Sequence, residues 1–143
     1  MNPPLRGKAD REALVAGILD GTIDMIATDH APHSAEEKSR GLANSAFGIV
    51  GIETAFPLLY TKLVKPGILS REKLLDLLVY NARARFDIPL GESFSVWDLD
   101  AEFTVDPDEF LSKGRATPLA GMKLLGRNLL TVHNGRVVYE HTV

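Results

Sequence analysis

The chain has 143 residues, and its 16 basic and 19 acidic side chains give a formal net charge of −3 at pH 7. That balance excludes the strongly basic surface typical of nucleic-acid binding, and no apolar run reaches the roughly 18 residues that cross a bilayer. With 45% hydrophobic residues, no cysteine and no signal-peptide pattern at its start, the sequence predicts a soluble, globular, cytoplasmic protein.

The N-terminal third is predicted to contain a helix, a strand and a polar loop. Residues 9–20 favour a helix, because apolar side chains recur there at helical spacing and Gly21 follows as a stop. Residues 24–28 are predicted to form a short buried strand, which runs into a loop at Asp29-His30-Ala31-Pro32-His33. The charged segment 34–44 is expected to be a mobile loop.

Two further helices are predicted before residue 90. The first covers about residues 52–63, with Pro57 tolerated in its first turns. The second follows the turn at Pro66-Gly67 and is capped by Ser70. Its predicted apolar face consists of Leu74, Leu75, Leu78 and Val79.

After Pro89 the pattern changes to strands. Residues 94–97 and 103–105 are rich in aromatic and β-branched side chains. Two β-branched runs flank Asn134-Gly135, a pair that favours a type I′ hairpin because both turn positions need a positive φ. The sequence therefore predicts an α/β first part and a smaller β-rich second part.

Asp29 is the strongest candidate for chemistry. An acidic residue that leaves the carboxyl end of a buried strand lies where α/β sheets place their active sites, and an aspartate can bind a metal or accept a proton. His33, four residues on, could donate a hydrogen bond to a substrate anion. The alternative is that Asp29 ends a turn and that His30 and His33 are solvated. These three residues alone do not make a zinc site, and the remaining histidines, His133 and His141, are expected to be structural or solvated.

Two other segments could contact a ligand. The prolines of Asn2-Pro3-Pro4-Leu5-Arg6 would hold the Asn2 amide in a defined place, although these residues by themselves favour a plain N-terminal arm. The glycines of Gly48-Ile49-Val50-Gly51 would let backbone approach a ligand or a helix closely. The spacing is not that of a phosphate-binding loop, so a nucleotide role is not supported.

Taken together, these segments resemble bacterial dihydroorotase, a family of the amidohydrolase superfamily. Asn2-Pro3-Pro4-Leu5-Arg6, Ala27-Thr28-Asp29-His30-Ala31-Pro32-His33 and Phe47-Gly48-Ile49-Val50-Gly51-Ile52-Glu53-Thr54 occur in the order and spacing of that family. The later Asn81-Ala82-Arg83, the stretch 110–121 and the final hairpin are also similar to its C-terminal end.

The resemblance implies a zinc hydrolase of pyrimidine biosynthesis, which interconverts N-carbamoyl-L-aspartate and dihydroorotate with one or two zinc ions. In that family Asp29 matches a metal-binding aspartate that also accepts and returns a proton. His33 matches a histidine that holds the substrate carboxylate, and Asn2 matches an asparagine that hydrogen-bonds the substrate. Phe47 and Gly48 match backbone that touches the pyrimidine ring.

Several parts of the family pattern are missing from the chain. The His-x-His pair, the bridging carboxylate, two later histidine ligands and an arginine that grips the substrate would all precede Met1. The chain is also too short for a complete (β/α)8 barrel of about 200 to 250 residues. The resemblance therefore implies α/β architecture, with the C-terminal part of an amidohydrolase barrel at residues 1–88 and strands of a small β-sandwich at residues 89–143. Such a fragment is expected to be inactive and not to retain zinc.

Two alternatives remain open at this point. The chain could be a non-catalytic dihydroorotase-like scaffold, because dihydroorotases that resemble it can associate with aspartate transcarbamoylase and catalytically dead relatives serve as scaffolds. It could also come from another cyclic amidohydrolase, an allantoinase or a hydantoinase. An incomplete barrel exposes strand edges and apolar faces, so a homo-oligomer is expected. The resemblance gives no role to Arg6 or His30.

Overall fold

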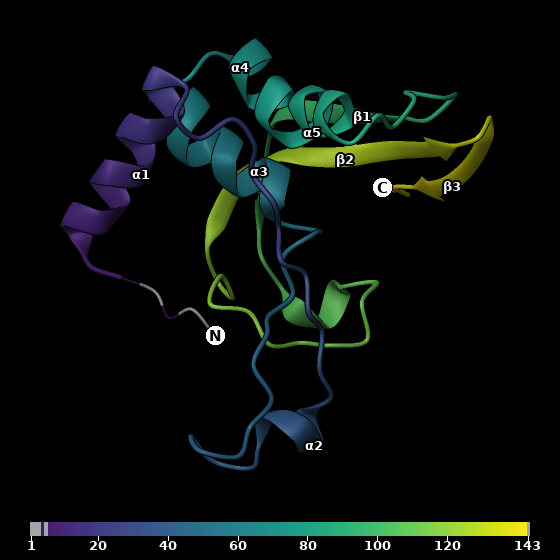
Figure 1. Ribbon diagram of the computed structural model, residues 1–143. Coiled ribbons are helices and arrows are strands. Elements are labelled where there is room, and N and C mark those ends of the chain that lie inside the picture. The colour runs from purple at the N-terminus through teal and green to yellow at the C-terminus, as the bar shows by residue number, and fades with distance from the viewer. Residues whose placement is uncertain (1–3, 5, 143) are drawn as a thin grey trace. The chain divides into compact units, whose positions relative to one another are not determined.

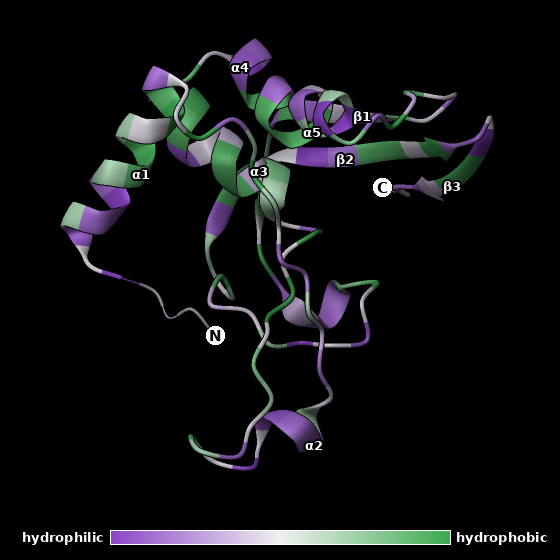
Figure 2. Ribbon diagram, viewed as in Figure 1, coloured by the Kyte–Doolittle hydropathy of each residue, from purple (hydrophilic) through white to green (hydrophobic). Residues whose placement is uncertain are grey.

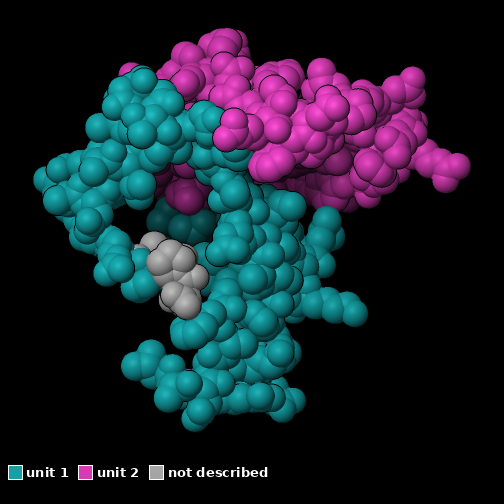
Figure 3. Space-filling view, in the orientation of Figure 1, with its two compact units in different colours: residues 1–55, 104–122 teal, residues 56–103, 123–143 magenta. Residues whose placement is uncertain are grey.

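The computed structural model describes residue 4 and residues 6–142. These residues form two compact units, one from residues 1–55 and 104–122 and the other from residues 56–103 and 123–143 (Figure 3). Each unit therefore combines two stretches that are distant in the sequence. None of the helices that the described residues form is both long and apolar enough to cross a membrane.

The first unit begins with helix α1, Lys8–Asp20 (Figure 1). This confirms the predicted helix and its stop, because Gly21 adopts a left-handed conformation with φ 86°. At the other end, the Asp10 carboxylate accepts a hydrogen bond of 3.1 Å from the Gly7 N–H. The helix carries polar and apolar residues on its surface (Figure 2), and only Ile18 is buried.

The predicted strand at residues 24–28 is wrong for the described part of the chain. The structure has only one isolated parallel bridge nearby, between His30 and Ile49. There the N–H of Ala31 donates a 3.0 Å hydrogen bond to the Ile49 carbonyl. A strand needs neighbouring strands to pair its backbone groups, and this unit provides a partner at one position only.

The helices between Ala55 and Arg85 belong almost entirely to the second unit. The helix predicted at about residues 52–63 begins later than expected, at Ala55, because residues 52–54 form a turn. It continues through α3, Ala55–Leu59, into the π-helical turn η1, Tyr60–Val64. Pro57 lies in the first turn of α3, where its missing N–H costs no hydrogen bond.

The next helix confirms the predicted cap, because the Ser70 hydroxyl accepts a 3.0 Å hydrogen bond from the Lys73 N–H. Leu74 and Leu77 are fully buried, whereas the other predicted face residues are only half-buried. Leu77 thus replaces its neighbours as the core residue of this stretch. The helix runs through three consecutive elements, α4 Arg71–Leu75, η2 Asp76–Tyr80 and α5 Asn81–Arg85.

A three-stranded sheet with the order β1-β2-β3 completes the second unit. The two strands predicted at 94–97 and 103–105 belong to one strand, β1, Phe94–Thr104. Strands β2, Lys123–His133, and β3, Arg136–Glu140, pair antiparallel. Asn134 and Gly135 have φ of 48° and 73°, which confirms the predicted hairpin turn.

Helix α3 and the sheet meet through aromatic rings and one hydroxyl. The Phe56 ring lies 4.6 Å from Trp97 and 5.8 Å from Tyr60 between ring centroids. The Thr61 hydroxyl accepts a 2.8 Å hydrogen bond from the N–H of Leu125 on β2. These contacts give the second unit its own core.

Candidate functional site

The candidate site is formed in the first unit by two adjoining segments, residues 29–33 and 47–51. Asp29 is exposed and has a φ of 47°, in the left-handed region that aspartate enters more readily than most residues. Residues held in sparsely populated conformations are concentrated at functional sites, where the surrounding structure maintains the strain. The backbone therefore presents the Asp29 carboxylate in a specific, unusual way.

His30 links the two segments through its ring. Its Nδ1 atom accepts hydrogen bonds from the backbone N–H groups of Gly51, at 3.2 Å, and Ile52, at 3.3 Å. A ring nitrogen that accepts cannot also carry a proton, so the neutral ring has its proton on Nε2. His30, which directly follows Asp29, thereby fixes the start of the turn that precedes α3 beside the segment 29–33.

Residues 31–33 lie between two glycines that allow very close backbone packing. A Cβ atom added at Gly48, which has a φ of 135°, would lie 2.5 Å from the carbonyl oxygen of Ala31. One added at Gly114 would lie 2.8 Å from the Pro32 Cβ and 3.1 Å from the His33 nitrogen. Gly114 has no positive φ, and sequence reasoning noted it only as one residue of the stretch 110–121.

Glu53 holds the loop that carries Gly114. Its carboxylate accepts hydrogen bonds from the N–H groups of Leu111, at 2.8 Å, and Ser112, at 3.1 Å, and from the Ser112 hydroxyl at 2.6 Å. The Val50 N–H adds a 2.9 Å hydrogen bond to a carbonyl just beyond that loop. Sequence reasoning missed this role, because the partners are nearly sixty positions apart.

Replacing Glu53 with glutamine should destabilise the first unit by about 1–2 kcal/mol. The amide keeps one acceptor oxygen but turns the other into a donor group facing backbone N–H groups. Urea unfolding, followed through amide signals of residues 110–114, measures the effect. Glu109→Gln, on an exposed glutamate of the same segment, is the matched control; equal unfolding of the two variants would refute the role of Glu53.

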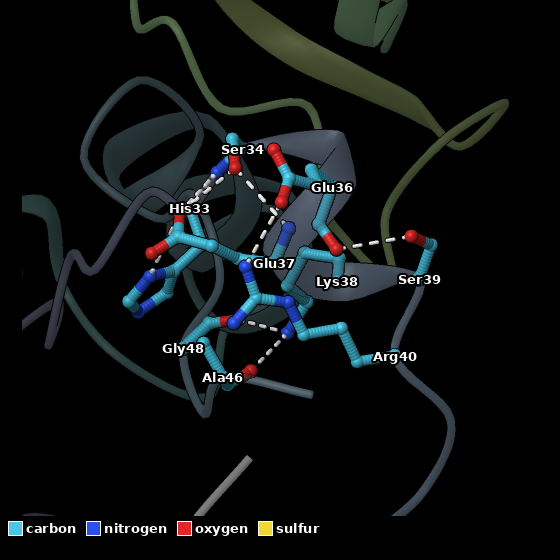
Figure 4. A network of polar contacts seen from close by, with 9 residues as sticks. All are labelled: His33, Ser34, Glu36, Glu37, Lys38, Ser39, Arg40, Ala46 and Gly48. Carbon is cyan, nitrogen blue, oxygen red and sulfur yellow. Dashed lines mark hydrogen bonds and ion pairs between the residues drawn. The ribbon is translucent and has the colours of Figure 1, made fainter. Parts of the chain in front are cut away.

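The segment expected to be a mobile loop contains the capped helix α2, Ala35–Lys38 (Figure 4). The Ser34 hydroxyl accepts a 3.2 Å hydrogen bond from the Glu37 N–H, and the Glu37 carboxylate accepts one of 2.9 Å from the Ser34 N–H. This reciprocal pair is a capping box. The segment is therefore not a loop throughout, because residues 35–38 form a short capped helix.

Helix α2 contacts both segments of the site. The Glu37 carboxylate lies 3.7 Å from Nδ1 of His33. The Lys38 ammonium donates 2.9 Å hydrogen bonds to the carbonyls of Ala46 and Gly48 (Figure 4).

The pKa of Glu37 lies below its ordinary range, chiefly because the N–H and then the hydroxyl of Ser34 donate hydrogen bonds to the carboxylate, with a smaller contribution from His33. A carboxyl whose pKa is lower in the folded state stabilises the fold at higher pH, and this is lost as the pH falls through the folded value. We expect acid to loosen α2, which a pH titration of the amide signals of residues 35–38 would show. Glu37→Gln should remove that response; an unchanged response would contradict the expectation.

The structure brings four of the five predicted site residues into one unit. Asp29, His33, Phe47 and Gly48 lie on the two adjoining segments, with the Phe47 side chain 61% exposed. Asn2 lies outside the described residues.

The described residues supply too few ligands for a zinc ion. Across residue 4 and residues 6–142, no three histidine, cysteine, aspartate or glutamate side chains are grouped so that they could hold a metal ion. Protein zinc sites use three or four ligands. The described residues therefore do not fit a zinc ion by themselves, and Asp29 would be one ligand at most.

The sequence is similar to curated proteins that share one name. No protein-family model matches the chain. The protein named dihydroorotase from Fusobacterium nucleatum subsp. nucleatum is 54% identical over 146 residues, which cover 97% of this chain and 34% of the relative. The chain thus spans about a third of the length of the curated relatives it matches.

Solved structures show the same architecture. The L-hydantoinase (dihydropyrimidinase) from Arthrobacter aurescens matches 96% of this chain and 33% of its own, with a TM-score of 0.85 and 29% identity. The inactive dihydroorotase-like domain of the Chaetomium thermophilum CAD-like multifunctional protein matches 93% of this chain and 36% of its own, with a TM-score of 0.70 and 25% identity.

These matches confirm two predictions from the sequence. The fold is that of the amidohydrolases, α/β with a small sheet, and the chain covers only part of it. Over nearly its whole length, the chain is homologous to bacterial proteins named dihydroorotase. The match covers about one third of the length of those proteins.

Proposed function

We propose that this chain is the C-terminal portion of a dihydroorotase, the zinc hydrolase that interconverts N-carbamoyl-L-aspartate and dihydroorotate. The observation that carries the proposal is the 54% identity to a dihydroorotase over 97% of the chain. The hydantoinase with a similar fold is only 29% identical. The sequence therefore favours dihydroorotase within a fold that both enzymes share.

In this proposal, Asp29 is the catalytic residue of the chain. In hydrolysis its carboxylate would accept a proton from the attacking water and return it to the amide nitrogen that leaves as the ring opens. In ring closure it would take a proton from that nitrogen as it attacks and return it to the departing water. His33 binds the substrate carboxylate, the backbone at Phe47 and Gly48 contacts the ring, and Asn2 hydrogen-bonds the substrate. When bound, zinc would supply Lewis-acid polarisation. The close packing of residues 31–33 against Gly48 supports a shared site for these groups.

The remaining zinc ligands would come from the two thirds of the relatives that this chain does not match. By the same proposal, residues 1–88 belong to the barrel and residues 89–143 to the flanking β-sandwich of a cytoplasmic enzyme. The chain alone would be inactive and would self-associate through surfaces that the complete enzyme covers. Association with aspartate transcarbamoylase is a further part of the proposal.

A chimaera tests the function directly. This chain would replace the matching third of the Fusobacterium nucleatum dihydroorotase. We expect the chimaera to hold zinc after dialysis and to hydrolyse dihydroorotate, whereas the chain alone should do neither. A folded chimaera that binds zinc but hydrolyses only hydantoins would favour the hydantoinase alternative.

The similarity to the inactive Chaetomium thermophilum domain supports a second candidate, a non-catalytic scaffold. The same chimaera separates the two. A scaffold would fold within it without restoring turnover. Light scattering on the chain alone then tests assembly, since a compact monomer would contradict a role in association.

A further inference from the structure

We propose that helix α2 is a positioning element of the site, in which Glu37 orients His33 and Lys38 holds the backbone on both sides of Phe47. The inference rests on the proposed function, because His33 and the Phe47–Gly48 backbone are the groups assigned there to substrate binding. It adds two residues with no assigned role, both on a segment expected to be a mobile loop.

Hydrogen bonds from Ser34 hold the Glu37 carboxylate beside His33. Its carboxylate accepts 2.9 Å hydrogen bonds from both the N–H and the hydroxyl of Ser34. The same carboxylate lies 3.7 Å from His33 Nδ1, with the two side chains 43% and 28% exposed (Figure 4). Because Glu37 accepts only, it favours a proton on Nδ1. A ring oriented in this way keeps Nε2 turned from Glu37 and free for the substrate carboxylate.

Lys38 acts on the second segment. Its ammonium donates 2.9 Å hydrogen bonds to the Ala46 and Gly48 carbonyls, which flank Phe47 in the sequence. The lysine is half-buried, so water competes only weakly for these hydrogen bonds. They fix the direction of the two carbonyls and leave the intervening residue exposed.

The two contacts converge on one place. A Cβ at Gly48 would lie 3.0 Å from Cδ2 of the His33 ring, so the ring packs directly on the glycine backbone. Consecutive residues of one short helix therefore hold both partners of that contact. Moving α2 would displace the ring and the backbone together.

The helix also provides its own control. Glu36 and Arg40 form a 3.1 Å ion pair with 85% and 52% of their side chains exposed. Like the Glu37 contact with His33, this pair involves a glutamate of α2, but both of its side chains face solvent. A pair of this kind contributes little to stability.

Kinetics of the chimaera form the first arm of the test. Glu37→Gln keeps the capping box, because glutamine also accepts there, but it removes the charge beside His33. Lys38→Met removes both hydrogen bonds to the carbonyls. For each variant we expect the KM for dihydroorotate to rise about tenfold while kcat changes less than twofold. Lys38→Arg should recover most of the loss, and Glu36→Gln should behave as the parent. An unchanged KM, or a fall in kcat alone, would overturn the proposal.

Nuclear magnetic resonance of the 143-residue chain is the second arm. Glu37→Gln should shift the ring nitrogen signals of His33, and Lys38→Met should shift the amide signals of Phe47 to Ile49, while Glu36→Gln shifts neither. Unmoved signals in the first two variants would overturn the positioning roles. If the parent chimaera proves inactive, the proposed function fails, and this arm still decides whether α2 orients the two groups.

Discussion

Replacing Asp29 with asparagine should lower the kcat for dihydroorotate hydrolysis about a thousandfold in the chimaera, since a general base contributes 10²- to 10⁴-fold. The asparagine amide cannot accept the proton and is a poorer metal ligand than a carboxylate. Asparagine also tolerates the left-handed conformation at φ 47°, so the backbone should stay in place. Steady-state turnover, with zinc content measured on the same samples, checks the result.

Asp87 offers a matched control for this substitution. It is also an exposed aspartate with a positive φ, 53°, but it belongs to the second unit, whereas residues 29–33 belong to the first. Asp87→Asn should leave kcat within twofold of the parent. If Asp29→Asn retained more than a tenth of the activity, the carboxylate would not be the proton carrier.

Replacing Gly48 with alanine should destabilise the first unit by about 3 kcal/mol, through strain at a positive φ and overpacking. The new Cβ would lie 2.5 Å from the Ala31 carbonyl oxygen and 2.7 Å from the Ala31 Cβ. Neither atom is at the end of a flexible side chain, so the backbone of residues 31–33 must shift to relieve the clash. Urea unfolding followed through the amide signals of residues 29–33 measures the loss.

Gly41→Ala separates the two causes. Gly41 lies in the same unit with a φ of 78°, and no atom lies within 4 Å of its added Cβ. That variant therefore has the backbone strain without the collision, and we expect it to lose only about 1 kcal/mol. Equal losses at both glycines would show that close packing at Gly48 is not what the site depends on.

The elements predicted well are those whose signals are local. Helix α1 and its stop at Gly21, the Ser70 cap and the hairpin at Asn134-Gly135 all follow from residues within one or two turns of each other. The candidate site was also recognisable in part. Asp29 and His33 stand in a short motif, and the structure places the His33 ring beside Gly48.

The elements predicted poorly depend on distant partners. Residues 24–28 are apolar enough for a strand, yet within the described unit they find no continuous neighbour to pair with. Segment 34–44 looked mobile because its charges were read as solvated. In the structure, the Lys38 ammonium instead donates hydrogen bonds to the carbonyls of Ala46 and Gly48, eight and ten positions further along the chain.

The amino-acid sequence alone determined the family resemblance, the stop of α1, the Ser70 cap, the hairpin and the aspartate expected to do the chemistry. Only the tertiary structure revealed that Glu53 holds the loop of Gly114, and that this glycine and Gly48 enclose residues 31–33. The reason is physical. Turns and caps are settled by neighbouring dihedral angles and hydrogen bonds, whereas close backbone packing depends on which distant segments the folded chain brings together.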